Sequence, residues 1–275
     1  MTWASRITRF LRRSTHWPHS APPAGATLEE CIAYQIECLP RHYLPGIGIG
    51  DFISEGNDLV DLLRSIGGLK PDDSVLDVGC GLGRVAIPLQ RAIDGGSYDG
   101  FDIVREIIIW NTVNITGISP NFRFAHLNVR NSTYNPGGEL NPAEASFPYP
   151  TDSFSFAFAT SLFTHLQENA TKTYLRELRR VLRPGSQAVL TFFILSRSGE
   201  KRAEAGETDI AFPHRWEHGR FNNLDQPEDA VAYDWEWLDE RVNDLGFDVC
   251  SIHWGRWSGN TEGLSYQDVV VLRAR

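Results

Sequence analysis

The chain has 275 residues, of which 41% are hydrophobic, and it carries a formal net charge of −9 at pH 7. This length and hydrophobic content suffice for one α/β domain with additions around a full core. The negative net charge argues against nucleic acid or another polyanion as a partner, and the sequence has no apolar run long enough to span a membrane. The four cysteines lack metal-site spacing, which favours a reducing compartment, so we expect a cytoplasmic protein.

We expect three regions in chain order: a basic N-terminal segment with a linker at 1–27, a helical cap at 28–70, and a main domain at 71–275. In the first region, apolar residues repeat at helical spacing among four arginines. This pattern fits a terminal helix docked on the domain or on a second copy in a homodimer, a frayed tail, or a helix on a membrane surface. The glycine-rich stretch at 45–51 fits either a hinge that closes over a ligand or an ordinary surface turn.

Residues 75–84, Val-Leu-Asp-Val-Gly-Cys-Gly-Leu-Gly-Arg, predict an apolar strand that ends in an acid, then three alternating glycines, then a helix. Alternating glycines let the backbone turn sharply and approach a ligand with no Cβ in the way. We expect the helix to aim free N–H groups at whatever binds there. The stretch therefore predicts a small-molecule site at a strand–helix turn.

Two cofactor classes use such a turn. Gly81 and Gly83, with Asp102 about 20 residues on, fit the dinucleotide fingerprint. However, the acid Asp77 precedes the first glycine, Gly79, and an acid is a poor neighbour for a pyrophosphate but a good one for an ammonium group. In this order of residues, the run closely resembles motif I of the class I S-adenosylmethionine (SAM)-dependent methyltransferases.

The resemblance implies SAM as the cofactor and a doubly wound, Rossmann-like α/β fold with a seven-stranded sheet. It continues through a second strand ending in Asp102, which in the family accepts hydrogen bonds from the ribose hydroxyls. A third strand over 122–129 follows, where Asn128 occupies a position that is often Asp and meets the adenine amine. A fourth strand over 154–161, a helix ending at Pro184-Gly185, and a fifth strand over 188–194 complete the match. The cofactor residues implied in this way are Asp77, Gly79, Cys80, Gly81, Gly83, Asp102, Ile103, Asn128, Val129 and Thr160.

The rest of the chain is expected to add a lid and a closing hairpin. Residues 196–232 are polar and irregular, and a loop of this length is commonly a lid or a binding loop. A helix capped by Asp234 and two strands over 247–254 and 267–273 follow. A closing antiparallel hairpin is typical of the methyltransferase sheet, whereas the nicotinamide fold ends in a parallel strand, so this feature discriminates between the two cofactors.

Two histidines are candidate catalytic residues. If the acceptor is an alcohol, its proton must leave, and a positioned base is worth ~10²–10⁴ in rate. His165 lies just past the fourth strand, where ligands bind in open α/β sheets, although it would equally cap or pack the next helix. His214 lies in the long loop, where a solvated histidine is the alternative. A divalent metal such as Mg²⁺ would also acidify a hydroxyl, and the sequence leaves this question open.

Aromatic residues suggest the acceptor. Phe163, Trp216 and Trp257 lie in or near the loops expected to crown the site, and flat aromatic faces suit sugar rings, with core packing as the alternative. We therefore expect SAM-dependent methyl transfer to a hydroxyl of a small molecule, a sugar or polyol. The segment 161–185 resembles methyltransferases of glycan assembly, such as the methylmannose-polysaccharide type. The alternatives are N- or C-methylation of a small metabolite and a SAM-binding protein without catalysis.

Overall fold

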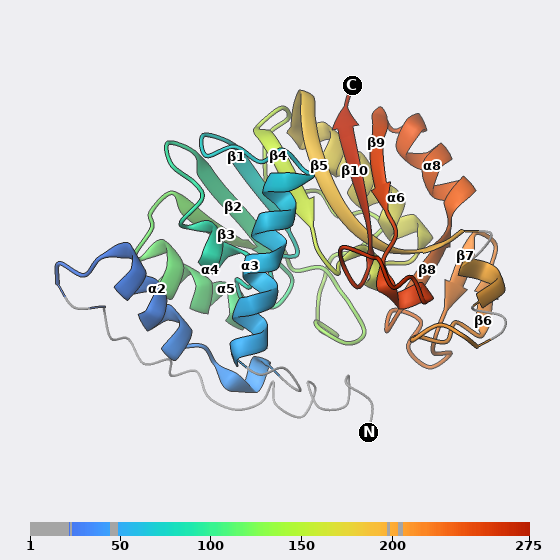
Figure 1. Cartoon of the computed structure of the whole chain (residues 1–275), viewed down its shortest axis with the longest axis horizontal. Helices are drawn as coiled ribbons and strands as arrows, with labels where there is room; N and C mark the ends of the chain where they lie inside the picture. Colours follow the sequence, from blue (N-terminus) through green and yellow to red (C-terminus); the bar gives the residue numbers. More distant parts are fainter. Residues whose placement is uncertain (1–21, 23, 45–48, 197–198, 203–205) are drawn as a thin grey trace. The chain divides into compact units, whose positions relative to one another are not determined.

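A computed structural model of the protein describes residues 22, 24–44, 49–196, 199–202 and 206–275. The predicted basic helix at the N-terminus and residues 45–48 of the predicted hinge lie outside the described residues. The chain divides into two compact units, with the boundary between Asn128 and Val129 (Figure 1).

The first unit contains three parallel strands, β1 (Ser74–Val78), β2 (Ser97–Asp102) and β3 (Phe122–His126). β2 lies between the other two, with Val78 opposite Phe101 and Asp102 opposite His126. Nearly every residue of β1 and β2 is buried, as expected of parallel strands with both faces covered. The third strand is shorter than predicted: it ends at His126, so residues 127–129 lie beyond it.

The helices of this unit are α2 (Leu28–Glu37), α3 (Ile49–Ser65), α4 (Ala86–Leu89) and α5 (Arg105–Asn111), with short turns η1 (Arg41–Tyr43) and η2 (Thr112–Thr116). α2 begins at a capping box, in which the Thr27 hydroxyl accepts from the Glu30 N–H and the Glu30 carboxylate accepts from the Thr27 N–H.

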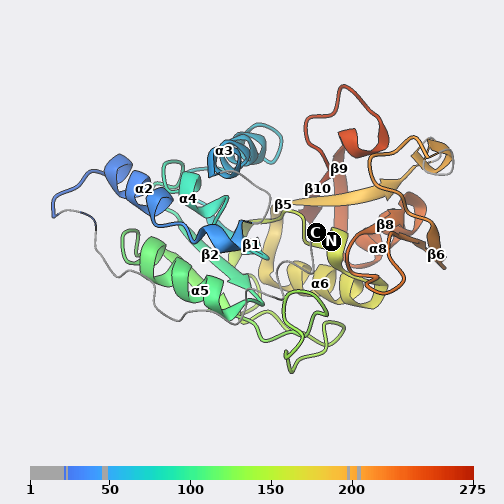
Figure 2. The ribbon, with the colours of Figure 1, turned by 90° about the horizontal axis from the view of Figure 1, so that it is seen from below.

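The predicted cap at 28–70 contains two helices, α2 and α3, and both pack on α4 (Figure 2). The side-chain amides of Gln35 in α2 and Gln90 donate to each other's oxygen, at 3.1 and 2.8 Å, and this pair is buried. α3 approaches more closely, because a Cβ on its Gly56 would lie 2.1 Å from the Arg84 carbonyl oxygen. α3 already includes Ile49, so the end of the predicted glycine-rich hinge is helical rather than a turn.

The second unit begins its regular structure with β4 (Phe154–Ala159), followed by the turn η3 (Phe163–His165), α6 (Glu168–Val181) and β5 (Leu182–Leu195). β4 and β5 are parallel. β5 starts immediately after α6, so Pro184-Gly185 does not separate helix from strand as predicted. Instead it lies in an irregular start of the strand, opposite a register shift between Phe154 and Phe156.

The predicted closing hairpin is present. β10 (Asp268–Ala274) runs antiparallel to β5, and β9 (Phe247–His253) runs antiparallel to β10. The helix α8 (Trp235–Asp244) precedes β9. Asp234 is the N-cap residue by position, but its side chain makes no capping hydrogen bond, which corrects the predicted cap. Its carboxylate lies 3.5 Å from the Arg215 guanidinium.

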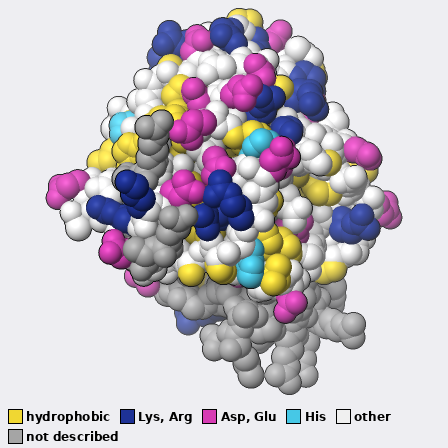
Figure 3. All heavy atoms as spheres, turned by 90° about the vertical axis from the view of Figure 1, so that its right-hand side faces the viewer, with side chains coloured by type: hydrophobic (Ala, Val, Ile, Leu, Met, Phe, Trp, Pro, Cys, Tyr) yellow, Lys and Arg dark blue, Asp and Glu magenta, His cyan; other side chains and the backbone are white. Residues whose placement is uncertain are grey.

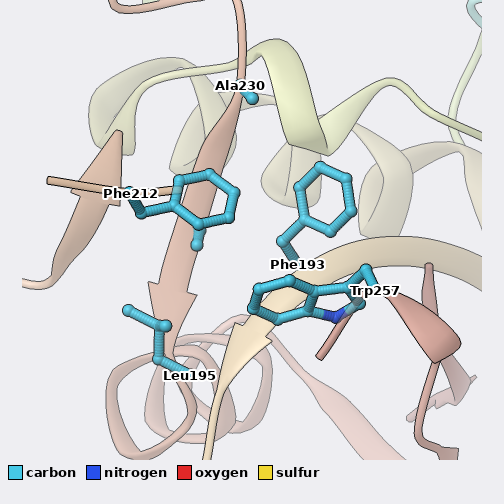
Figure 4. Close-up of a cluster of buried hydrophobic side chains, with 6 residues drawn as sticks. Phe193, Leu195, Phe212, Ala230 and Trp257 are labelled. Atoms are coloured by element: carbon cyan, nitrogen blue, oxygen red, sulfur yellow. The ribbon is translucent and has the colours of Figure 1, made fainter. Parts of the chain in front are cut away.

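Part of the predicted lid is sheet rather than irregular loop. β6 (His214–Trp216), β7 (Gly219–Phe221) and β8 (Val231–Asp234) form antiparallel pairs, and β8 pairs in parallel with residues 193–195 of β5. This extension is possible because the apolar run of β5 continues to Leu195, beyond its pairing with β10 at Gln187–Phe192. The extension covers a core cluster of Phe193, Leu195, Phe212, Ala230, Ala232 and Trp257, the last from the turn η4 (Arg256–Ser258) (Figure 4).

Candidate active site

The glycine turn after β1 is tied to the end of β2. The N–H groups of Gly79 and Cys80 both donate to the Phe101 carbonyl at 3.0 Å, and the Gly81 N–H donates to Asp102 Oδ2 at 2.9 Å. The protein itself therefore uses the N–H donors of these three residues, which precede the helix. A pyrophosphate depends on free donors at such a turn, so this arrangement suits a cofactor that binds by other contacts.

Two glycines of the turn are needed for different reasons. Gly81 and Gly83 have φ of +50° and +79°, in the left-handed region that favours glycine. A Cβ on Gly83 would lie 2.8 Å from Ile115 Cδ1, so this glycine allows close packing. A Cβ on Gly81 would have no atom within 4 Å, so this glycine borders open space. Gly81 therefore leaves room beside Asp102 for a ligand.

Asp77 is a buried acid with one unused oxygen. Its Oδ2 accepts from the Tyr98 hydroxyl at 2.6 Å, whereas its buried Oδ1 has no hydrogen-bond partner among the described residues. Burial raises the pKa of Asp77 to about 7, the Tyr98 hydrogen bond lowers it, and the nearby Asp102 raises it further. A buried acceptor without a partner is costly, and a ligand ammonium group would satisfy it, so this residue fits the amino-acid end of SAM.

Asp102 is held at the end of β2 by two backbone donors. Its Oδ2 accepts from Gly81, and its Oδ1 accepts from the Val104 N–H at 2.9 Å. Burial raises its pKa, although the backbone hydrogen bonds oppose this shift. Each carboxylate oxygen has two lone pairs, so each keeps one for a further donor. The half-buried Asp102 can therefore accept from a pair of ligand hydroxyls while it braces the turn.

The remaining cofactor candidates of the first unit lie close to these residues in sequence. The Ile103 carbonyl pairs with His126 Nε2 at 3.2 Å, and Asn128 is half-buried, two residues after the end of β3. The Cys80 side chain is buried, and burial together with the charges of Asp102 and Asp77 raises its thiol pKa well above the usual value. The Cys80 thiol is therefore unreactive, and its contact with the cofactor stays a prediction.

Asn111 in α5 is a site residue that the sequence analysis missed. Its amide nitrogen donates to the Gly81 carbonyl at 2.8 Å, it is fully buried, and its Oδ1 has no partner among the described residues. It therefore braces the glycine turn from a helix 30 residues further along the chain. A possible signal was available, because a polar side chain interrupts the apolar run Ile-Ile-Ile-Trp of residues 107–110.

In the second unit, Val129 and Thr160 are the two remaining cofactor candidates. Val129 is buried and forms an isolated bridge with Leu140. Thr160 is half-buried and follows the last residue of β4. The next residue, Ser161, has φ of +58°, which is uncommon for a non-glycine residue, and its N–H donates to Thr191 Oγ1 at 2.7 Å. β4 thus ends two residues earlier than predicted, at a constrained turn.

His165 lies at the end of η3, half-buried, with its Nδ1 3.0 Å from the Glu228 carbonyl oxygen. We assign the proton to Nδ1 because a carbonyl only accepts, so the neutral ring keeps its lone pair on Nε2. Burial lowers the pKa of His165, and hydrogen bonds to the Glu228 and Asp229 backbone oppose this shift. The ring is therefore neutral near pH 7, the form that can take a proton.

Two of the three aromatic substrate candidates are core residues, which corrects the prediction. Phe163 is 1% exposed and stacks on Phe192 with ring centroids 4.8 Å apart. Trp257 has no exposed surface. Its indole packs against Phe193, and its Nε1 donates to Asp268 Oδ2 at 2.7 Å (Figure 4). Neither ring has a free face for a ligand, because the apolar side chains of this unit already cover both.

The candidates on β6 are more accessible. His214 and Trp216 are half-buried, and both pack against Phe221 on the neighbouring strand, with ring centroids 5.1 and 5.4 Å away. Trp216 is almost parallel to that ring, and its indole also contacts Tyr233. These two side chains therefore lie on a small sheet extension and not on an irregular loop.

The described residues contain neither a candidate metal site nor a helix suited to span a membrane. No group of three or more His, Cys, Asp or Glu side chains there is arranged to hold a metal ion. No described helix is both long and apolar enough to cross a membrane. On the face shown in Figure 3, basic and acidic side chains are interspersed.

Comparison with known proteins identifies the domain. Residues 75–185 match the family model described as "Methyltransferase domain". The PH0226 protein from Pyrococcus horikoshii OT3 has a similar structure, with a TM-score of 0.56 and 17% identity over 82% of this chain and 92% of that chain. The 1,6-didemethyltoxoflavin-N1-methyltransferase of Burkholderia thailandensis, solved with S-adenosylhomocysteine (SAH), gives a TM-score of 0.51 and 16% identity over 90% and 91% of the two chains.

The [4+2]-cyclase SpnF is also similar, with a TM-score of 0.51 and 18% identity over 78% of this chain and 80% of that chain. At such identities the structural likeness establishes the fold, which is the Rossmann-like α/β fold of the methyltransferases. The family match adds that residues 75–185 are a methyltransferase domain. The chain therefore carries a methyltransferase domain, matched at residues 75–185, on this fold.

Proposed function

We propose that this protein transfers the methyl group of SAM to a hydroxyl of a small molecule, a sugar or polyol, with His165 as the general base. The observation that carries the base role is the hydrogen bond between His165 Nδ1 and the Glu228 carbonyl. It orients the ring and leaves Nε2 to accept the proton of the attacking hydroxyl. His214 on β6 is the second candidate for this role.

The first unit supplies the cofactor contacts in this proposal. SAM provides a methyl group on a sulfonium, which an oxygen nucleophile attacks in line. Asp77 holds the ammonium group of the cofactor through Oδ1, and Asp102 accepts from its ribose hydroxyls. Gly81 gives the cofactor room at the turn, and Asn128 accepts from the adenine amine. Ile103 completes the binding surface of the first unit, and Val129 and Thr160 are the cofactor candidates of the second unit. The segment at 28–70 acts as the cap, and residues 196–232 act as the lid.

The sugar-like acceptor is supported by Trp216, a half-buried aromatic side chain of β6 that stacks on Phe221, because aromatic rings suit sugar rings. It is also supported by the resemblance of residues 161–185 to methyltransferases of glycan assembly, including the methylmannose-polysaccharide type. An amine acceptor is the second candidate, because the Burkholderia thailandensis neighbour is a 1,6-didemethyltoxoflavin-N1-methyltransferase. A neutral base would serve both reactions, since each acceptor loses a proton on methylation.

The test is turnover of methyl-labelled SAM with a panel of sugars, polyols, phenols and amines. We expect label on a hydroxyl compound, and we expect His165→Gln to lower kcat by about 10²-fold or more with little change in SAH affinity. His253→Gln, a histidine on β9 that pairs with Ser251, is the matched control and should retain full activity. Label only on amines would reject O-methylation. Full activity of His165→Gln would reject the base role and transfer it to His214.

A further inference from the structure

Two loops of the second unit contact His165. From residues 222–230, the Glu228 carbonyl accepts from His165 Nδ1 at 3.0 Å. From residues 129–135, the Tyr134 ring meets the imidazole edge-on, with ring centroids 5.8 Å apart and an interplanar angle of 77°. The ring is therefore fixed by a hydrogen bond on one edge and by an aromatic contact.

The same two loops are joined by a hydrogen-bonded contact, which we call the 132–228 clasp. Both the N–H and the hydroxyl of Ser132 donate to Oε2 of Glu228, at 3.0 and 2.7 Å. Glu228 thus uses its backbone carbonyl to hold His165 and its side chain to hold the neighbouring loop. Two donors on one charged oxygen make a stronger contact than a neutral hydrogen bond.

Each loop is braced within itself, so the clasp connects two ordered segments. Asn131 Oδ1 accepts from the backbone N–H groups of Thr133 and Tyr134, at 3.0 and 2.9 Å. In the other loop, the Asn222 side chain accepts from the Ala230 N–H at 2.9 Å and donates to Asp229 at 2.8 Å. A shift of the Glu228 side chain therefore also moves its backbone carbonyl, which contacts His165, because these hydrogen bonds keep the rest of the loop from rearranging.

We infer that Glu228 and Ser132 are positioning residues, whose clasp fixes the ring orientation and the Nδ1–H tautomer of His165. This inference rests on the proposed function, in which Nε2 of His165 takes the proton. The clasp lies at the surface, where water competes for both partners. Its loss should therefore loosen the carbonyl without unfolding the unit.

The test combines nuclear magnetic resonance of the full chain, labelled with ¹⁵N-histidine, with steady-state kinetics. The His165→Gln spectrum identifies the His165 signals. We expect one nitrogen of His165 to be protonated in the wild type and Glu228→Ala to show mixed tautomers. We also expect Glu228→Ala to lower kcat on the order of tenfold while KM for SAM changes little. Glu228→Gln keeps an acceptor oxygen and should restore part of both properties. Asp225→Ala, an exposed carboxylate of the same loop, is the matched control.

Unchanged His165 signals in Glu228→Ala would overturn the inference, even if His165→Gln is inactive and the base role stands. Changed signals with unchanged turnover would overturn it as well. If His165→Gln also kept full activity, the base role of His165 itself would be wrong. A loss of kcat in Glu228→Ala without a change in His165 would point to a general structural effect, and would also count against the clasp as a positioning device.

Discussion

Replacement of Asp77 by Asn tests how the cofactor site recognises the ammonium group. Asp77 is buried, its Oδ2 is used by Tyr98, and its Oδ1 has no partner among the described residues. The pKa of about 7 means that the carboxyl of the free protein is partly protonated at neutral pH. A ligand that carries an ammonium group favours the ionised form, so its binding should release a proton and depend on pH.

The magnitude follows from the titration. A group with a pKa of about 7 is ionised in about a tenth of the molecules at pH 6 and in about nine tenths at pH 8, so SAH should bind roughly tenfold more tightly at pH 8. Asp77→Asn removes the charge-assisted contact, worth about 1.5–3 kcal/mol, and should weaken binding at pH 8 by about 10- to 150-fold. Variant and wild type should differ less at pH 6, where Asp77 is mostly protonated.

The stability of the protein without ligand should depend on pH in the opposite direction to SAH affinity. Because the folded-state pKa of Asp77 is raised, the folded protein without ligand holds this proton more tightly than the unfolded chain does. The free energy of unfolding should therefore fall as the pH rises from about 4 to about 7. Asp77→Asn should remove this part of the pH dependence.

Isothermal titration calorimetry with SAH between pH 6 and 8 measures the binding effect. Methylthioadenosine, which lacks the amino-acid end, is the matched control ligand: its affinity should be insensitive to Asp77→Asn, and its own pH dependence reports on Asp102. Equal affinity of the wild type and Asp77→Asn for SAH at pH 8 would refute the reasoning. So would a loss of affinity that is the same for both ligands.

Two further predictions test the glycine turn and the core. Gly83→Ala places a Cβ 2.8 Å from Ile115 Cδ1 and should lower the free energy of unfolding by about 1–3 kcal/mol in a denaturant titration. Gly81→Ala should lower it by only about 1–2 kcal/mol but weaken SAH binding by about tenfold or more. If both variants changed stability and binding in the same way, this distinction would be wrong. Trp257→Phe removes one of the hydrogen-bond donors to the buried Asp268 and should lower the free energy of unfolding by about 1–3 kcal/mol, with KM for the acceptor unchanged. A raised KM with normal stability would instead assign Trp257 to the acceptor site.

Fold likeness does not determine the reaction, as the similarity to the cyclase SpnF illustrates. The same strand order can support different chemistry, because the reacting groups lie in the turns and loops after the strands. In the function proposed above, those groups are Asp77 and Asp102 for the cofactor and His165 for the acceptor. The predictions above therefore address these side chains directly.

Local sequence determined the cofactor turn and most strands. In the run from Val75 to Gly83, apolar residues are followed by glycines at alternate positions. This pattern predicts a strand and a glycine turn, and the structure has both. The closing strands were also predictable, because two short runs rich in apolar and β-branched residues follow the end of a helix. These features depend on neighbours within a few residues, which a single sequence displays.

Tertiary structure alone decided which side chains face a ligand and which face the core. Trp257 resembles an exposed loop aromatic in sequence, but Asp268 and Phe193 enclose it. Asn111 reaches the glycine turn across 30 residues, and the Glu228 carbonyl reaches His165 across 63. The pairing of β8 likewise depends on residues 193–195 of β5, which extend beyond the part of the strand that pairs with β10. Contacts between distant segments are set by how the whole chain closes on itself, and no local pattern of residues records them.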